Sequence, residues 1–113
     1  MDSKQLSWSD FEKVDIRVGT VMEALDFPEA RKPAYKLHID FGAPIGVLKT
    51  SAQITKLYAK ESLIGQQLVA VVNFPEKQIA NFKSQCLVLG AVNKDEVTLL
   101  QPMSKVHNGL KIS

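Results

Sequence analysis

Apolar and polar residues alternate along most of this chain with a period of two, the pattern of strands whose two faces differ. The clearest case is Tyr35–Phe41, where apolar residues alternate with Lys36, His38 and Asp40. Val14–Leu25 predicts a long strand, in which Gly19 is expected to mark a bulge or bend. Further strands are predicted over Ile45–Leu48, Leu68–Val72, Gln85–Leu89 and Val97–Leu100.

The period changes over Ser51–Tyr58, where Ile54, Leu57 and Tyr58 follow helical spacing and Ser51 can cap the helix. A second short helix is predicted near the N-terminus, with Ser9 and Glu12 as a capping box and Trp8 free to pack back on the fold.

Many short strands favour closure into a barrel, because a closed sheet has no exposed edges. We therefore expect an all-β fold of five or six strands, a small Greek-key barrel of the oligonucleotide-binding (OB) type. One short internal helix follows its third strand and one short helix precedes the barrel. A β-sandwich is the alternative that periodicity alone leaves open.

The chain has 113 residues, so we expect a single domain over 1–113, with its OB-type part over about residues 8–113. No apolar run reaches the length of a membrane span, and no signal peptide pattern opens the chain. The single Cys86 cannot pair within the chain, which fits a reduced setting. A cytoplasmic location without membrane insertion is expected.

Charge is distributed unevenly, although the net charge is only +2. Residues 1–40 carry eight acids and six bases, whereas residues 41–113 carry four acids and eight bases. A basic face built from the later part of the chain would attract phosphates. The alternative is that scattered lysines serve solubility.

Residues suited to catalysis or metal binding are sparse. His38 and His107 lack acidic or cysteine companions at ligand spacing, and Cys86 lies within an apolar strand pattern. Asp10, Glu12 and Asp15 are explained by a helix start and a strand face. The chain also lacks a glycine-rich phosphate loop with a lysine. We expect neither an enzyme nor a cofactor or metal.

Two segments carry groups suited to binding nucleic acid. The first is a strand end followed by a predicted helix start, which presents backbone donors to a phosphate. The second is a polar loop in which Phe82 could stack a base or lie in the core, whereas Phe74 is expected to be buried. The predicted RNA site comprises Lys49, Ser51, Gln53, Lys56, Asn73, Lys77, Asn81, Phe82, Lys83, Ser84 and Gln85.

Motifs in order along the chain then point to a family. They are Asp10–Thr20, Phe27–Arg31, Ile39–Gly42, Ser51–Thr55, Val71–Pro75, Phe82–Ser84, Leu87–Gly90, Leu99–Pro102 and Asn108–Ile112. From about Trp8 to the C-terminus the sequence resembles the tRNA-binding domain of CsaA-type proteins. Ser51, Asn73, Lys83 and Ser84 match positions of the shared domain pattern.

The resemblance implies a five-stranded barrel, a homodimer and the binding of structured RNA, especially tRNA, without catalysis. It also implies a second role as an export-related chaperone, with unfolded precursor proteins and the export machinery as partners. Apolar residues outside the barrel strands could supply the dimer contact, namely Trp8, Phe11, Val106, Leu110 and Ile112.

Overall fold

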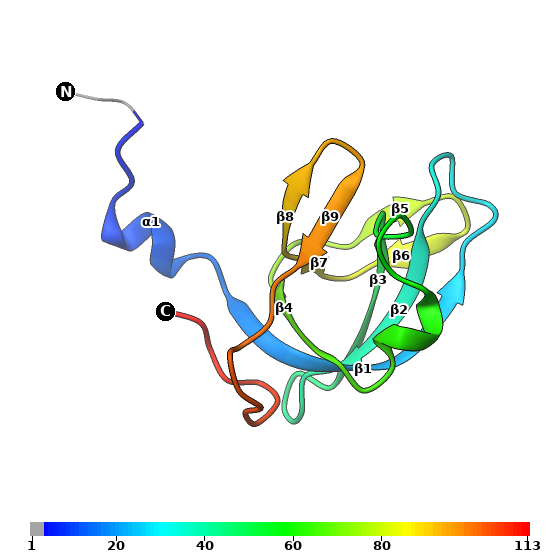
Figure 1. The fold of residues 1–113 in the computed structure, drawn as a ribbon. Helices are drawn as coiled ribbons and strands as arrows, with labels where there is room; N and C mark the ends of the chain where they lie inside the picture. Colours follow the sequence, from blue (N-terminus) through cyan, green and yellow to red (C-terminus); the bar gives the residue numbers. More distant parts are fainter. Residues whose placement is uncertain (1–3) are drawn as a thin grey trace.

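Five antiparallel strands form the main sheet, in the order β3-β2-β1-β4-β7. They are β1 (Ile16–Asp26), β2 (Tyr35–Asp40), β3 (Val47–Ala52), β4 (Gln67–Val71) and β7 (Leu87–Val88). The structure, a computed structural model, describes residues 4–113. The sheet curls into a nearly closed barrel (Figure 1), and the Gln85 amide donates to the Lys49 carbonyl at 2.8 Å across the gap. The predicted all-β, OB-type barrel is confirmed.

Shorter elements complete the fold. They are the N-terminal α-helix α1 (Trp8–Glu12), the 3₁₀ helix η1 (Lys60–Leu63), and two hairpins made by β5 (Lys77–Ile79) with β6 (Phe82–Ser84) and by β8 (Gly90–Asn93) with β9 (Glu96–Leu99). Sequence reasoning missed β5, β6 and β8, because each is only three or four residues long and β5 and β8 have mostly exposed side chains.

The barrel core confirms the alternation predicted for β2. Leu37, Ile39 and Phe41 are fully buried, whereas Lys36 and His38 on the opposite face are partly exposed. The three buried side chains pack with Val21 and with other core residues contributed by β1, β4 and the connecting segments. A sheet with one buried face produces this pattern.

Gly19 has a different role from the predicted bulge. The register between β1 and β2 shifts between Val21 and Glu23, so the irregularity lies at Met22. A Cβ atom at Gly19 would lie 2.6 Å from Ile39 and 2.8 Å from the Phe41 ring. Glycine is therefore needed because the two strands approach closely around the core.

The C-terminal segment extends the sheet beside the first residues of β1. The Val18 amide donates to the Leu110 carbonyl at 3.1 Å, and the Ile112 amide donates to the Ile16 carbonyl at 2.8 Å. Ile16 then packs with Val69, Val71, Phe11, Leu89 and Ile112 on the outside of the barrel. The Ile16 side chain is thus covered by the terminal segments rather than by the main core.

The internal helix predicted over Ser51–Tyr58 is wrong. Strand β3 continues through Ala52, because Ser51 pairs with Lys36 and Ala52 pairs with Tyr35. Turns follow, and the one-turn helix is η1, several residues later. Leu57, which the helical spacing placed on an apolar face, is 46% exposed. The pairing of β3 with β2 therefore outweighs the helical spacing, which rested on only three residues.

Helix α1 forms where it was predicted, but its cap differs. Ser7, not Ser9, is the N-cap, and its hydroxyl accepts from the Asp10 amide at 3.0 Å. Trp8 does not pack back on the fold, since it is 86% exposed on a helix that lies apart from the barrel (Figure 1). The helix has no fully buried residue, and Phe11 is its side chain that packs against the barrel, beside Ile16.

Candidate nucleic-acid interface

A broad groove of about 1790 Å³ extends from the surface down to core residues such as Ile54 and Cys86. Its walls come from the β1–β2 loop, the end of β3, the β5–β6 hairpin and the β8–β9 hairpin. In OB barrels the second and third strands, with the loops after the first and fourth strands, form the usual ligand surface. The β5–β6 hairpin lies in the connection that follows β4. The groove, which this hairpin and the β1–β2 loop line, therefore overlaps the usual ligand surface.

Cations outnumber acids among the charged residues that line the groove. Arg31 and Lys32 come from the β1–β2 loop and Lys77 from β5, whereas Glu76 is the one acid in the lining. The Glu76 carboxylate accepts from the Gln85 side-chain amide at 2.9 Å. This balance favours an anionic ligand.

Two more lysines lie on the outer face of β2 and β3 beside the groove. The Lys49 ammonium is 5.2 Å from the centroid of the Phe82 ring, and the Lys36 ammonium is 5.9 Å from that centroid. We call the following set the cationic face: Arg31, Lys32, Lys36, Lys49 and Lys77.

Phe82 belongs to a small apolar cluster beneath the β5–β6 hairpin. It is 9% exposed and meets Phe27 edge-on, with ring centroids 5.4 Å apart. Ala30, Ala34 and Ile79 complete the cluster and also line the groove. Of the two roles that the sequence left open for Phe82, the structure gives it the buried one.

The Ser84 hydroxyl holds the same hairpin to β3. It lies 2.9 Å from the Thr50 hydroxyl and accepts from the Ser51 amide at 3.2 Å. Thr50 also donates to the Cys86 carbonyl at 2.7 Å. These contacts fix one wall of the groove against the barrel.

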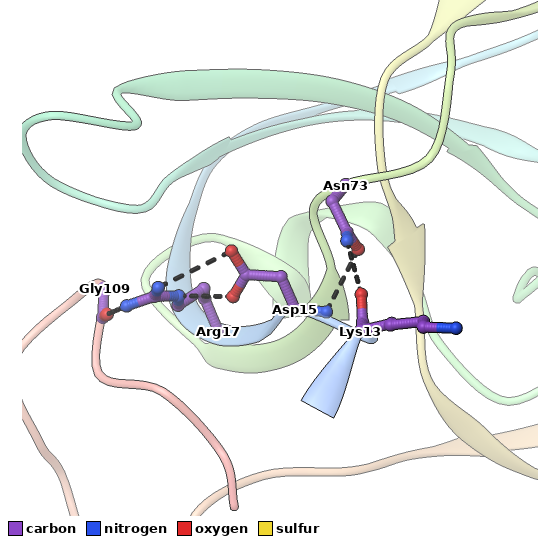
Figure 2. A network of polar contacts seen from close by, with 5 residues as sticks. All are labelled: Lys13, Asp15, Arg17, Asn73 and Gly109. Carbon is purple, nitrogen blue, oxygen red and sulfur yellow. Dashed lines mark hydrogen bonds and ion pairs between the residues drawn. The ribbon is translucent and has the colours of Figure 1, made fainter. Parts of the chain in front are cut away.

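Asn73 anchors the N-terminal segment to the end of β4 (Figure 2). Its side-chain amide donates to the Lys13 carbonyl at 2.7 Å, and its oxygen accepts from the Asp15 amide at 3.0 Å. Next to it, Arg17 pairs with Asp15 at 2.6 Å and donates to the Gly109 carbonyl at 3.0 Å. The network joins both terminal segments to the barrel.

The predicted RNA-site residues fall into four groups. Ser51, Gln53, Lys77 and Ser84 line the groove. Lys49, Phe82 and Gln85 lie beside it, and Asn81 and Lys83 are exposed on the β5–β6 hairpin. The two others hold other elements: Lys56 pairs with Asp95 of the β8–β9 turn at 3.5 Å, and Asn73 binds backbone near α1. A role in RNA binding stays a prediction for all eleven residues.

Sequence reasoning left out four residues of this region. Arg31 and Lys32 stood out as adjacent cations, but nothing in the sequence placed their loop beside β5. Lys36 was recognised only as an outward-facing strand residue. Phe74 was expected to be buried, yet it is 54% exposed and lines the groove. The chain turns outward after β4, because Asn73 is held by its contacts near α1.

The predicted dimer residues lie on the terminal segments. Phe11 and Ile112 pack on the outer face of β1 and β4, the Val106 amide donates to the Gln67 side chain at 3.1 Å, and Leu110 is 48% exposed. Of the five, Trp8 and Leu110 are the exposed ones. The dimer contact stays a prediction.

Groups suited to other chemistry are few. Among residues 4–113, no cluster of three or more His, Cys, Asp or Glu side chains could hold a metal ion. Burial raises the pKa of the Cys86 thiol to about 12, so this thiol is a poor nucleophile. Within the described part of the chain, no helix is long and apolar enough to cross a membrane.

Comparisons with known proteins agree with this picture. Residues 16–111 match the family model described as a putative tRNA binding domain. The crystal structure of a CsaA chaperone from Bacillus anthracis str. Ames has 55% sequence identity and a TM-score of 0.92, covering 96% of this chain and 99% of that one. A CsaA chaperone structure from Picrophilus torridus has 54% identity and a TM-score of 0.91, covering 96% and 100%.

Methionine–tRNA ligases are similar over a shorter part of their length. The enzyme of Pyrococcus furiosus is 34% identical over 107 residues, which is 95% of this chain and 14% of that protein. The chain therefore spans about a seventh of the length of these curated relatives. The resemblance to CsaA-type tRNA-binding domains is confirmed.

Proposed function

Because the chain belongs to the tRNA-binding domain family, we propose that it binds tRNA and catalyses no reaction on it. The observation that carries the proposal is the cationic face: Arg31, Lys32 and Lys77 line the groove, and Lys36 and Lys49, on β2 and β3, lie over the Phe27 and Phe82 rings. OB barrels bind nucleic acid on the corresponding surface. The lysines and arginine of this face would contact phosphates, which set affinity and position the RNA. The amides of Gln53 and Gln78 in the groove lining would add polar contacts.

The test compares single charge removals with a matched control. Arg31→Ala and Lys77→Ala should each weaken tRNA binding about three-fold or more, because each removes one phosphate contact. Lys105→Ala removes an exposed lysine from the C-terminal segment outside the groove and should leave affinity unchanged. Equal effects of all three changes, or no effect, would place the tRNA elsewhere.

A second candidate function is capture of unfolded precursor proteins for export. It is favoured by apolar side chains in the groove, including Leu87 and Val92, which are 49% and 72% exposed. The CsaA structures are described as chaperones. Apolar capture should change little with salt, whereas phosphate contacts weaken steeply as salt rises. Precursor affinity measured at two salt concentrations therefore separates the two functions.

A symmetric homodimer in the cytoplasm completes the proposal. The predicted contact residues Trp8, Phe11, Val106, Leu110 and Ile112 belong to terminal segments that the network around Asn73 and Arg17 ties to the barrel. Two-fold pairing would present two cationic faces to one RNA. Sedimentation at micromolar concentration should give a dimer for the wild type and a monomer for Trp8→Ala combined with Leu110→Ala. A monomeric wild type would contradict it.

A further inference from the structure

Phe74 is the aromatic side chain that a ligand in the groove can reach. Among residues 4–113, the large exposed hydrophobic side chains include two aromatic ones, Trp8 at 86% and Phe74 at 54%. Trp8 lies on α1, apart from the barrel (Figure 1), whereas Phe74 lines the groove. An exposed aromatic ring in a concave surface marks a binding position, because leaving the ring in water costs free energy that is recovered when a ligand covers it.

The backbone holds Phe74 in this outward position. Asn73 precedes it and is fixed by hydrogen bonds to Lys13 and Asp15. Pro75 follows it, which confines Phe74 to an extended backbone and keeps β4 from continuing. Strand β5 begins two residues later and is paired with β6. The ring is therefore presented from a short segment that is anchored at both ends.

Phe82, the aromatic residue singled out from the sequence, cannot take this role. It is 9% exposed beneath the β5–β6 hairpin and packed edge-on against Phe27. Phe27 and two lysines, Lys36 and Lys49, already contact this ring, so it offers no free face to a base.

The surroundings of Phe74 fit a nucleotide better than an apolar peptide. Arg31, Lys32 and Lys77 line the same groove, with Glu76 as the one acid among the lining residues. Unpaired bases stack on exposed aromatic rings while neighbouring cations take the phosphates on either side. A base inside a helix already stacks on its neighbours and offers no free face.

We propose, on the basis of the tRNA-binding function above, that Phe74 stacks an unpaired base of the RNA. The groove then selects RNA in which a single-stranded segment adjoins a helix. The cationic face binds the phosphates of both parts, and Phe74 supplies the preference for the unpaired part.

The experiment uses two RNA hairpins with the same stem, one blunt and one with a single-stranded 3′ overhang that contains 2-aminopurine. The full chain is tested as wild type, Phe74→Ala, Phe74→Tyr and Val47→Ala. Val47 is the control, since it is also 54% exposed but lies on β3 outside the groove lining. Thermal unfolding of each variant checks that the fold is intact.

Phe74→Ala should weaken binding of the overhang hairpin about five-fold or more and change binding of the blunt hairpin less than about two-fold. It should also abolish the quenching of 2-aminopurine that stacking on the wild-type protein causes. Phe74→Tyr should keep both affinity and quenching, because it keeps the ring. Val47→Ala should behave as wild type.

Three outcomes would overturn the proposal. Equal weakening of both hairpins, or unchanged quenching with Phe74→Ala, would mean that the ring does not stack a base. Loss of unfolded-precursor binding with unchanged RNA affinity would make Phe74 part of a peptide groove. Failure of the wild type to bind either hairpin or tRNA would reject the tRNA-binding function itself, which the Phe74 variants alone cannot do.

Discussion

The ammonium group of Lys49 lies 5.2 Å from the centroid of the buried Phe82 ring. The ammonium group of Lys36 lies 5.4 Å from the centroid of the neighbouring Phe27 ring. Two lysines on the outer side of β2 and β3 therefore lie over this aromatic pair. A cation over a ring face is attracted by the quadrupole of the ring. Phe82 therefore positions cations at the edge of the groove, which is a different contribution from stacking a base.

Phe82→Ala should lower the free energy of unfolding by about 3 kcal/mol, since it removes a buried aromatic side chain and leaves a cavity beside Phe27. Urea denaturation measures the loss, and Phe82→Leu serves as the control because it keeps most of the apolar volume. If Phe82→Ala is as stable as wild type but binds tRNA poorly, the ring acts as a stacking surface and the buried role is wrong.

Lys49→Gln should weaken tRNA binding and reduce the slope of log K against log salt by about one, because one phosphate contact is lost. Stability should change little, since the lysine is at the surface. Titrations at several salt concentrations measure the slope, with Lys105→Gln as the control. The prediction fails if the two variants have the same slope.

Asn73→Ala should destabilise the protein by about 1–2 kcal/mol, because it removes both hydrogen bonds that hold the segment before β1. Asn73→Asp can still accept from the Asp15 amide but loses the donor to the Lys13 carbonyl, so it tests that bond separately. Hydrogen exchange of the Asp15 amide measures the loosening. If exchange is unchanged while tRNA affinity drops, Asn73 contacts RNA, as the sequence suggested.

Cys86 should make stability depend on pH under alkaline conditions. Burial raises the pKa of its thiol from 9.0 to about 12, so the unfolded chain loses this proton at a lower pH than the folded protein does. The contribution is complete below pH 9 and falls by about 1.4 kcal/mol per unit as pH rises toward 12.

Denaturation of wild type and Cys86→Ala across this range isolates the thiol, because the other groups titrate in both proteins. The stability difference between them should shrink steadily above pH 9. A difference that stays constant up to pH 12 would show that the folded protein ionises the thiol as readily as the unfolded chain.

The barrel could be predicted because its strands bury one face, and this leaves a period of two in the sequence. Leu37 and Ile39 are fully buried, as their alternation with Lys36 and His38 indicated. The helix over Ser51–Tyr58 could not be excluded from the sequence, because the pairing of Ser51 with Lys36 depends on a strand elsewhere in the chain.

The site could be predicted only in part for the same reason. Lys77 and Ser51 were identified from local chemistry, and the structure brings both to one groove. Arg31 and Phe74 required knowledge of how the β1–β2 loop faces the segment after β4. Exposure of Phe74 reversed the burial that its position after a strand suggested, whereas burial of Phe82 decided between two roles that the sequence had left open.

Titration of the wild-type chain with tRNA at two salt concentrations tests the central claim, that the cationic face binds RNA through its phosphates. The account predicts saturable binding that weakens more than ten-fold between about 50 and 200 mM salt, because several phosphate contacts release counterions. Absence of binding at the lower salt concentration, or an affinity that is the same at both, would contradict it.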